Sequence, residues 1–534
     1  MYNDSYYHFY SGVRRYAVAP RVPVLIVGAG VGGLATSALL AQHGIRSLLV
    51  EKRREFFLYP KARNLSFRSS EVLRGLGLRD EVRAVAEHVS AMVVRPTLNS
   101  AVQEPALDVE AIFAGLDKLS PEPAAQYCPQ SRLEPILRDA ARQGGSDVRY
   151  GTELSSIEMD ETGVTAVLRD AESGESETVG ADYLVGADGV HSPIRDWLGI
   201  TTSGYGALPI YVVFVYFRAP WRRFIAELHD GDGVQVKNDD VDGIFLVVKD
   251  DFGMFITTYF PGAGETAEQF TPQRCRDVLT RAFGEPMDIE IIEVAAWQPY
   301  ERVADQFDCG RAFLVGDSAH TMPPFKAGGA NTAIQSAHNL AWKLAAVLHG
   351  TAAPELLATY HAERHPVGRF AARQSLTGPS VALLRAGGEV PQLPADEECS
   401  MFALLIGYRY RSAAVVTRDA DGDGPVDELR AQPGTRVPHV WVREGVSTLD
   451  LLGPRFTVLS GDERWCAAAA SASLAAHRIY GDEWATVTGL PPDGALLIRP
   501  DDFVGWRADE LPADPEGALR QALSAILGPL PPRA

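Results

Sequence analysis

The feature that most constrains this chain is one continuous motif near its start, residues 22–51. Val24–Val27 is a short apolar run, as expected for a strand buried on both faces of a parallel sheet. A glycine-rich turn follows, then a stretch with helical periodicity from Leu34 to Gln42. Ile45–Val50 is a second apolar run, and it ends at Glu51. The order strand, turn, helix, strand and acid predicts the first half of a doubly wound α/β domain.

The glycines of this motif, Gly28, Gly30 and Gly33, have G-x-G-x-x-G spacing. Gly28 permits a tight turn, Gly30 lets the backbone approach a pyrophosphate, and Gly33 lets helix and strand pack closely. The helix N-terminus attracts phosphates through its free N–H groups, and Glu51 can accept hydrogen bonds from a ribose. The alternative is a glycine-rich turn in a domain that binds no nucleotide. The complete motif favours a dinucleotide site.

The overall composition excludes several classes of function. A net charge of −19 argues against a nucleic-acid surface, which requires a basic face. No apolar run approaches the length of about 18 residues that a membrane span needs, and the N-terminus has no signal-peptide pattern. Five scattered cysteines fit reduced thiols, so we expect a cytoplasmic protein without a metal site. The oligomeric state is left open between monomer and homodimer.

Changes of texture along the 534 residues divide the chain into several domains. Residues 201–300 are rich in aromatic and β-branched residues, which predicts an antiparallel sheet in a domain that interrupts the nucleotide domain. We expect a tail at 1–20, a nucleotide-binding domain at 21–89, 128–200 and 301–377, a substrate-binding domain at 90–127 and 201–300, and a C-terminal α/β domain at 400–534.

Two further glycine- and aspartate-containing patches, 186–189 and 316–324, also follow short buried strands. In a doubly wound sheet the carboxyl ends of such strands meet at one edge, where ligands bind. All three patches can therefore contact one extended ligand. FAD fits, because its ribityl chain presents hydroxyl groups that Asp317 can hold.

With the sequences GADGVHSPIRDWLGI (186–200), GDSAHTMPP (316–324) and NTAIQSAHNLAWKLAAVL (331–348), the chain resembles the flavoprotein monooxygenases of the para-hydroxybenzoate hydroxylase type. It is most similar to the branch that hydroxylates aromatic polyketides, as GYRYRSAAVV (407–416) and LLIRPDDFVGWR (496–507) also indicate. The resemblance implies an α/β protein with a Rossmann-like FAD-binding domain, an inserted antiparallel-sheet substrate domain and a C-terminal thioredoxin-like domain.

The resemblance also implies a set of FAD contacts. They are Gly28, Gly30 and Gly33 at the pyrophosphate, Glu51 at the adenosine ribose, Lys61 or Arg63 near the flavin, Gln130, Asp188 and Gly189 elsewhere on the FAD, Asp317 at the ribityl hydroxyls, and Pro324, Gly329, Asn331 and Thr332 along the isoalloxazine. Asp188 and Gly189 are in addition tied to NAD(P)H use. No second G-x-G-x-x-G is convincing, so we expect NADPH or NADH to bind only transiently.

One loop departs from the family pattern. The family commonly has PPTGGQGMNT where this chain has PPFKAGGANT, so that Phe325 and Lys326 replace small residues. Either these two residues only repack the loop, or they reshape the space where oxygen and substrate meet. We expect a helix to begin at Asn331, with its N-terminus directed at the flavin.

The implied activity is hydroxylation of a phenolic, polycyclic, polyketide-type substrate with NAD(P)H and O2, through a flavin C4a-hydroperoxide. Tyr211, Phe245, Tyr259 and Phe325 are candidate substrate contacts, no catalytic residue is assigned, and His320 is interpreted as a structural turn residue. The alternatives are Baeyer–Villiger ring cleavage, an antibiotic-inactivating oxidation, and a flavin-binding protein without enzymatic activity. A disulfide oxidoreductase is disfavoured, because no close cysteine pair exists near the first motif.

Overall fold

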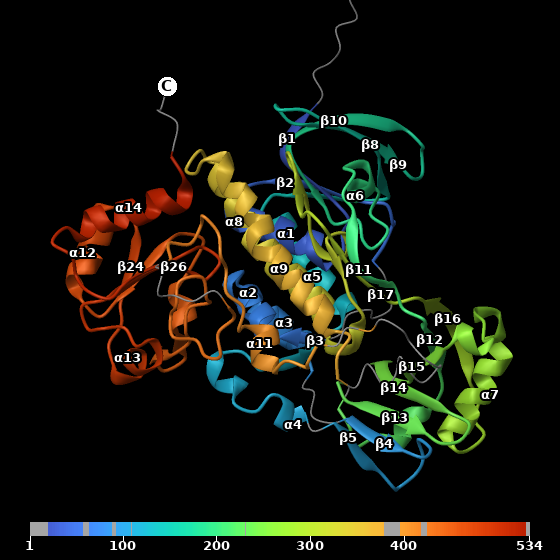
Figure 1. The fold of residues 1–534 in the computed structure, drawn as a ribbon. Coiled ribbons are helices and arrows are strands. Elements are labelled where there is room, and N and C mark those ends of the chain that lie inside the picture. The colour runs from blue at the N-terminus through green and yellow to red at the C-terminus, as the bar shows by residue number, and fades with distance from the viewer. Residues whose placement is uncertain are drawn as a thin grey trace, which may run out of the picture.

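The computed structural model describes residues 20–56, 64–87, 92–107, 109–229, 231–378, 393, 396–417 and 424–529. Lys61, Arg63 and almost all of the expected N-terminal tail lie outside these residues. Figure 1 shows three sheet-containing parts around two long helices, α8 and α9. No helix in the described ranges has both the length and the apolar character needed to cross a membrane.

The central sheet carries the first motif. Its strands lie in the order β18-β19-β10-β1-β2-β7, and β1 pairs in parallel with both β10 and β2. The strands are β1 (Arg21–Val27), β2 (Ser47–Glu51), β7 (Asp147–Tyr150), β10 (Ser176–Gly186), β18 (Asp308–Cys309) and β19 (Ala312–Leu314), with β8 (Thr152–Met159) and β9 (Val164–Asp170) joined to β10. The expected α/β class is confirmed.

Helices cover this sheet and extend toward the rest of the molecule. They are α1 (Val31–Gln42), α2 (Phe67–Gly75), α3 (Arg79–Val85), α5 (Gln130–Gln143), α6 (Pro193–Trp197), α8 (Gly328–Leu348) and α9 (Thr359–Gln374). Helix α1 contacts both α5 and α8, and their apolar residues join the strands in one large core. Because α8 is buried along almost its whole length, it forms the centre of the molecule rather than its surface.

The substrate-domain sheet has seven strands in the order β16-β12-β15-β14-β13-β4-β5. They are β4 (Met92–Arg95), β5 (Glu104–Leu107), β12 (Tyr211–Arg218), β13 (Gly233–Lys237), β14 (Asp242–Lys249), β15 (Phe252–Tyr259) and β16 (Glu290–Trp297). Helix α7 (Pro272–Phe283) packs on one face. The Thr271 side chain caps its start, and Gly284 ends it in a left-handed conformation.

Short strands connect the two sheets. They are β3 (Asn64–Ser66) paired with β6 (Ala125–Tyr127), and β11 (Thr202–Ala207), β17 (Tyr300–Ala304) and β20 (His320–Thr321) in a second small sheet. Tyr127 also donates a hydrogen bond to the backbone oxygen of Val247 at 3.2 Å. The remaining short elements are α4 (Val109–Ile112), α11 (Met401–Leu405), β21 (Trp441–Arg443) and β22 (Val446–Ser447).

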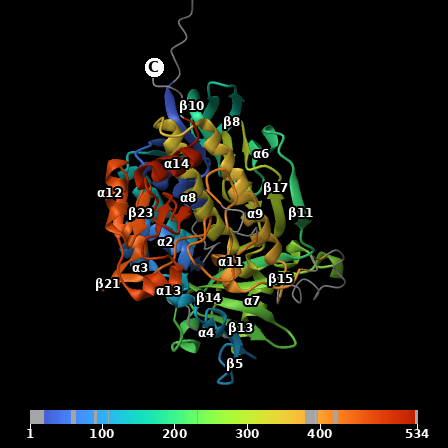
Figure 2. The same cartoon turned by 60° about the vertical axis from the view of Figure 1, so that its left-hand side comes forward.

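The C-terminal part has the order β-α-β-α-β-β-α, as in a thioredoxin fold. Its elements are β23 (Thr457–Ser460), α12 (Glu463–Ser471), β24 (Ala475–Arg478), α13 (Asp482–Thr488), β25 (Ala495–Ile498), β26 (Val504–Ala508) and α14 (Pro515–Leu527). Figures 1 and 2 show it against α8, and Trp342 of α8 belongs to its apolar core together with Val458 and Trp465. The expected three-part fold is therefore confirmed.

The start of α8 differs from the expectation. The helix begins at Gly328 rather than Asn331, because Ala327 adopts a left-handed conformation (φ 52°) that turns the chain directly into the helix. Glycines weaken the interior of a helix, but Gly328 and Gly329 lie in its first turn, ahead of the long buried stretch that stabilises α8.

Candidate functional site

The three glycine-containing patches meet at one edge of the central sheet, as expected. The backbone N–H of Ala187 donates to Val27 at 2.8 Å, which joins the second patch to the first. The Ser318 hydroxyl donates to the backbone oxygen of Gly186 at 2.6 Å, and Arg195 donates to the oxygen of Ser318 at 3.1 Å. These bonds join the third patch to the second.

Two glycines of the first motif are required by contacts within the protein. Gly28 has a φ of +107°, and a Cβ there would lie 2.2 Å from the oxygen of Ala187. A Cβ on Gly33 would lie 2.0 Å from the oxygen of Gly28. Both distances are far inside van der Waals contact, so the turn and the helix pack only with glycine at these positions.

Gly30 is different, because a Cβ at this position would meet nothing within 4 Å. It is the N-cap residue of α1, which has no side-chain cap and no acidic residue in its first turn. The N–H groups of that turn therefore border open space at a positive helix end. This cradle has the open space and the N–H groups that the pyrophosphate of a dinucleotide such as FAD requires.

Glu51 is held in place at the end of β2. It is buried, its Oε2 accepts from the N–H of Ala29 at 2.9 Å, and its Oε1 accepts from the N–H of Arg53 at 2.9 Å. The carboxylate borders a small hollow lined by Ala29, Glu51, Arg53, Glu55, Phe56, Glu134 and Tyr150. Gln130 adjoins this hollow, because its amide donates to Glu134 at 2.6 Å.

Tyr150 is a residue of this hollow that sequence reasoning missed. It lies opposite Glu51 on the neighbouring strand β7. Its hydroxyl is buried and has no hydrogen-bond partner among the described residues. Burial raises the pKa of Tyr150 to about 12, so the phenol stays protonated and can donate. Its position at the carboxyl end of the next parallel strand is the signal that identifies it.

Asp188 and Gly189 form the loop before α6. Both Asp188 carboxylate oxygens accept bonds within this loop, from the Ser192 hydroxyl at 2.6 Å and from the N–H of Ile194 at 3.0 Å. Burial raises the pKa of Asp188, and these two bonds oppose the rise. Gly189 has a φ of +90° and open space at its Cβ position. Asp188 thus shapes the loop, while Gly189 leaves room beside it.

The turn around Asp317 presents one acidic side chain. Asp317 is exposed, whereas Gly316, Ser318 and His320 beside it are buried. A Cβ built on Gly329 would lie 4.0 Å from Asp317 Oδ1, so the carboxylate is close to the first turn of α8. Neither ring nitrogen of His320 has a hydrogen-bond partner in the described part of the chain, and burial lowers its pKa to about 3. A neutral, enclosed imidazole agrees with a structural residue.

Asn331 and Thr332, the expected isoalloxazine contacts, are both buried and bonded within the protein. Asn331 Oδ1 accepts from the N–H of Ser66 at 2.9 Å, and its Nδ2 donates to the oxygens of Asn64 at 3.0 Å and Ala327 at 2.8 Å. This side chain therefore ties β3 to the start of α8. Thr332 is buried, and its oxygen accepts from Arg364 at 3.3 Å. The helix N–H groups nearest the open side belong to residues 328–331.

The two residues that depart from the family pattern both anchor the loop. Phe325 packs against the buried cluster of Leu208, Ile210 and Leu376. The Lys326 Nζ donates to the Thr377 hydroxyl at 2.9 Å and lies 2.7 Å from the Glu398 carboxylate. Of the two alternatives, these contacts favour repacking of the loop. Pro324, just before them, is exposed.

Three candidate substrate contacts lie on the face of the substrate-domain sheet that α7 covers. Phe245 is buried beneath α7, with its ring 5.5 Å from that of Phe283. Tyr211 and Tyr259 stack on each other at 4.8 Å and belong to the same cluster. Side chains alternate between the two faces of a strand. Because aromatic residues occupy both faces of β12, the sequence alone did not show which face is covered.

The opposite face carries a row of aromatic rings. Trp297, Phe214, Tyr216 and Phe252 follow one another with ring centres 6.0 to 6.2 Å apart. The apolar residues of this face are Ile244, Leu246, Val248, Met254 and Ile256. Ile210, which precedes β12, packs against Phe325. The row thus begins beside the loop that precedes α8.

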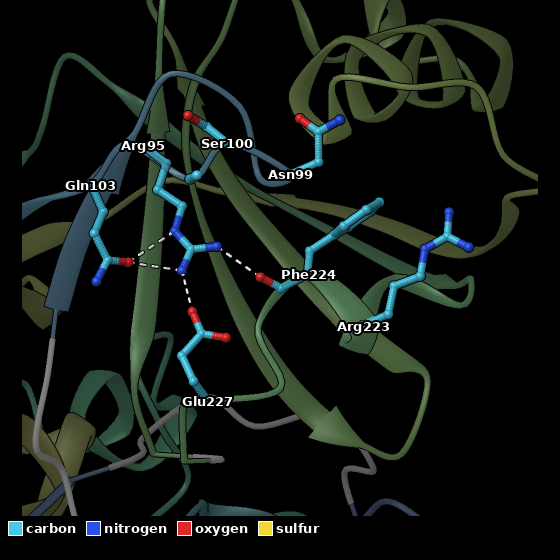
Figure 3. A pocket seen from close by; sticks show the side chains of 8 residues that line it. Arg95, Asn99, Ser100, Gln103, Arg223, Phe224 and Glu227 are labelled. Atoms are coloured by element: carbon cyan, nitrogen blue, oxygen red, sulfur yellow. Dashed lines mark hydrogen bonds and ion pairs between the residues drawn. The ribbon is translucent and has the colours of Figure 1, made fainter.

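A hollow of about 380 Å³ lies next to β4, among the residues in Figure 3. Its central cation, Arg95, is already satisfied. It donates to Gln103 at 2.8 Å, to the backbone oxygens of Leu98 and Phe224, and to Glu227. The charge of Arg95 is therefore paired within the protein.

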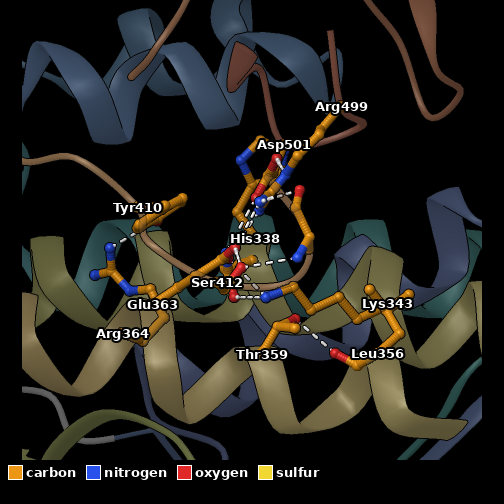
Figure 4. Close-up of polar contacts among 12 residues, drawn as sticks. His338, Lys343, Leu356, Thr359, Glu363, Arg364, Tyr410, Ser412, Arg499 and Asp501 are labelled. Atoms are coloured by element: carbon orange, nitrogen blue, oxygen red, sulfur yellow. Dashed lines mark hydrogen bonds and ion pairs between the residues drawn. The ribbon is translucent and has the colours of Figure 1, made fainter. Parts of the chain in front are cut away.

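A buried ionic cluster joins α8, α9 and the C-terminal part (Figure 4). Glu363 accepts from Lys343 at 2.7 Å and from Arg499 at 2.6 Å, and Arg499 also binds Asp501 at 2.6 Å. Burial lowers the pKa of Lys343 to about 8, opposed by Glu363. All four side chains are fully satisfied and enclosed, which indicates a structural junction.

Comparisons with known proteins agree with this geometry. Residues 21–375 match the family described as FAD binding domain, and residues 430–530 match the C-terminal region of aromatic-ring hydroxylases. The chain is 39% identical to tetracenomycin A2 monooxygenase-dioxygenase from Streptomyces glaucescens, over 95% of this chain and 97% of that one. It is 38% identical to 4-methyl-5-nitrocatechol 5-monooxygenase from a Burkholderia species, with the same coverage.

Among solved structures, the chain is similar to aklavinone-11 hydroxylase in a ternary complex with FAD and aklavinone. The TM-score is 0.85 at 33% identity, over 95% of this chain and 99% of that one. It is also similar to the flavin-dependent monooxygenase PieE in complex with FAD and substrate, with a TM-score of 0.82 at 30% identity, over 95% and 99% of the two chains.

Proposed function

This chain belongs to the family of FAD-binding aromatic-ring hydroxylases, and we propose that it hydroxylates a phenolic, polycyclic aromatic substrate with NADPH or NADH and dioxygen. In the overall reaction one oxygen atom replaces an aromatic hydrogen as a hydroxyl group. The second oxygen atom leaves as water, and NAD(P)H with one proton supplies the two electrons and hydrogens that this water requires.

FAD fits the residues of the central sheet edge. The open cradle at Gly30 would take the pyrophosphate, Glu51 the adenosine ribose, and the exposed Asp317 the ribityl hydroxyls. Tyr150 would donate to the adenosine end from the adjacent hollow. When bound, FAD accepts electrons from NAD(P)H and activates dioxygen for transfer to the substrate. Lys61, Arg63, Gln130, Gly189 and Pro324 remain proposed contacts.

The first turn of α8 would supply the electrostatic part of catalysis. Its N–H groups, residues 328–331, present the positive end of a 21-residue helix, which stabilises negative charge nearby. Asn331 fixes the direction of this helix end through its bonds to β3. Phe325 and the apolar sheet face would exclude water from the reacting ring.

The aromatic row on the sheet face opposite α7 is the observation that carries the substrate class. Trp297, Phe214 and Phe252 are half-buried, whereas Tyr216 between them is buried, so the three half-buried rings are the ones that would contact a ligand between this face and the loop before α8. Planar rings prefer to pack against other rings. A flat, multi-ring phenol would use the length of the row, whereas a single ring would cover only part of it.

A monocyclic catechol is the second candidate. The relative from Burkholderia acts, by its name, on 4-methyl-5-nitrocatechol, and it is about as similar to this chain as the tetracenomycin enzyme. The sheet face opposite α7 offers apolar contact to either kind of ring.

The purified protein distinguishes these candidates. We expect bound FAD, and NAD(P)H oxidation that a multi-ring phenol accelerates more than a substituted catechol does. Mass spectrometry should show a product with one added oxygen, and NMR should show an intact ring system; an opened or expanded ring would indicate Baeyer–Villiger chemistry instead. Protein without flavin, or flavoprotein whose NAD(P)H oxidation no phenol accelerates, would overturn the proposal.

The domain ranges are part of the same proposal. Strands β4 and β5 join the sheet of β12–β16, which supports assigning residues 90–127 and 201–300 to one substrate-binding domain. The ranges 21–89, 128–200 and 301–377 would form the FAD-binding domain, and 400–534 the C-terminal domain. The oligomeric state would be monomer or homodimer.

A further inference from the structure

We infer that Lys326 and Glu398 form an ion-pair latch that holds residues 324–330, here called the flavin loop, in place beside the cofactor. Lys326 is then a positioning residue, which acts through the loop rather than by touching the substrate. This inference rests on the proposed function for its catalytic consequence. Its structural basis, the contacts of Lys326, stands on the described geometry alone.

The latch is partly enclosed and has two partners. The Lys326 side chain is 12% exposed and that of Glu398 is 48% exposed, so the pair is shielded on the lysine side. The Lys326 Nζ lies 2.7 Å from Glu398 Oε1 and 2.9 Å from the Thr377 hydroxyl. An ion pair is stronger when it is shielded from water and shares a further hydrogen bond. The positive charge is thereby neutralised, so it is not available to stabilise charge on the cofactor.

The receiving side of the latch is fixed by one buried residue. Gln374, near the end of α9, donates to the oxygen of Glu397 at 3.1 Å and accepts from the N–H of Cys399 at 3.0 Å. These bonds hold the backbone on both sides of Glu398. Thr377 is also fixed, because its hydroxyl donates to the oxygen of Gln374 at 2.8 Å. Lys326 thus binds two residues whose neighbouring backbone is held by Gln374, independently of the flavin loop.

The flavin loop requires such an anchor. Pro324 is exposed, and Ala327 holds a left-handed conformation, which persists only where the surroundings impose it. Phe325 fixes the loop on one side of Lys326, and Asn331 fixes the start of α8 on the other. Without the latch, the stretch between these two anchors can shift, and the first-turn N–H groups shift with it.

The chain offers a matched control for the latch. Arg373 and Asp396 form a second ion pair, at 2.5 Å, between α9 and the segment that carries Glu398. This pair ties α9 to the segment that carries Glu398, as Gln374 does, but does not touch the flavin loop. The informative variants are Lys326→Met, Glu398→Gln, the exchanged pair Lys326→Glu with Glu398→Lys, and the control Arg373→Gln.

Two readouts test the latch in the full-length protein. The first is the rate of FAD release, followed by flavin fluorescence after dilution. The second is the amount of hydrogen peroxide formed per NAD(P)H oxidised, measured in the presence of a substrate that the enzyme hydroxylates. Because small displacements of catalytic groups have large effects, we expect Lys326→Met and Glu398→Gln each to raise both quantities about five- to tenfold. Arg373→Gln should match wild type, and the exchanged pair should return both quantities most of the way to their wild-type values.

Three results would overturn the inference. One is wild-type behaviour of Lys326→Met, and another is an equal rise of both quantities in Arg373→Gln. The third is a defect in Lys326→Met that Glu398→Gln does not reproduce, because Lys326 would then act as a cation by itself. The FAD release rates remain informative if no phenol is hydroxylated, so a failure of the proposed function is distinguishable from a failure of the latch.

Discussion

The two ends of the proposed FAD site are built in different ways. The adenosine end depends on backbone contacts within the first motif and the adjoining Ala187, where Gly28 and Gly33 permit approaches that no side chain could accommodate. The flavin end depends on side chains that reach across the molecule. Asn331 binds β3, Phe325 packs on Leu376, and Lys326 pairs with Glu398.

This difference predicts how each end responds to substitution. A backbone-determined turn tolerates almost no added atoms, because its neighbours are themselves backbone. A loop fixed by side chains can lose one anchor and keep its fold, since the remaining anchors still hold it. Substitutions at the adenosine end should therefore affect folding or cofactor binding outright, whereas those at the flavin end should produce graded effects on geometry.

The largest effect is expected for Gly28→Ala. The left-handed conformation and the overlap with Ala187 together should cost about 3 to 5 kcal/mol of unfolding free energy in the FAD-free protein. Gly30→Ala is the matched variant, because its added methyl group meets open space. Its unfolding free energy should fall by no more than about 1 kcal/mol, the cost of alanine at an N-cap, while its FAD affinity should fall at least about tenfold, or 1.4 kcal/mol.

Urea unfolding of both FAD-free variants and titration with FAD measure these quantities. If Gly28→Ala were as stable as wild type, the turn would not be determined by its backbone. If Gly30→Ala bound FAD normally, the open space above it would not be the pyrophosphate cradle.

At the flavin end, Asn331→Ala should have the next largest effect. It leaves the N–H of Ser66 and the oxygens of Asn64 and Ala327 without their side-chain partner. The Ser66 bond is buried and the other two are part-buried. An unsatisfied buried group costs about 1 kcal/mol or more and a lost part-buried bond about 0.5 to 1, so we expect a loss of about 2 to 3 kcal/mol. Asn331→Asp should lose less stability, because it keeps the acceptor for Ser66. Equal losses in the two variants would contradict the importance of that bond.

The strand–turn–helix arrangement around Gly28, Gly33 and Glu51 could be predicted closely from the sequence, whereas the contacts of the loop before α8 could be predicted only in part. Gly28, Gly33 and Glu51 act within local strand–turn–helix order, which periodicity and spacing reveal. Apart from Ala327, the partners of Asn331, Lys326 and Phe325 are separated from them by tens to hundreds of residues, and no local pattern encodes such contacts. The faces of β12 were unreadable for a related reason, because both faces carry aromatic residues, including Phe214 and Phe217.

His320 gives the flavin end a predictable dependence on pH. Burial lowers its pKa to about 3, whereas an unfolded histidine titrates near pH 6.5. Between these values the unfolded state binds a proton that the folded state does not, so stability is lost as the pH falls below about 6.5. His320→Phe removes this proton and should gain about 2 kcal/mol relative to wild type between pH 7.5 and pH 5.

Urea unfolding across this pH range tests the prediction. His349→Gln is the control, because His349 is exposed at the end of α8, and it should follow the wild-type pH dependence. Identical pH dependence in His320→Phe and wild type would mean that His320 binds a proton as readily in the folded protein as in the unfolded chain, and is not the enclosed neutral residue described above.

The smallest effect, and the most direct test of the comparison, is expected when glycine replaces alanine at the flavin end, the opposite of the Gly→Ala changes at the adenosine end. Ala327→Gly should relieve about 1 to 2 kcal/mol of left-handed strain while adding about 0.4 to 1 kcal/mol of unfolded-chain entropy. We therefore expect a net stabilisation of up to about 1 kcal/mol in the FAD-free protein. Ala330→Gly, in the first turn of α8 where no left-handed φ is held, should instead lose stability, by up to about 1 kcal/mol. Glycine would then stabilise only where the three anchors impose a strained turn, and destabilisation by Ala327→Gly would show that no strain is held there.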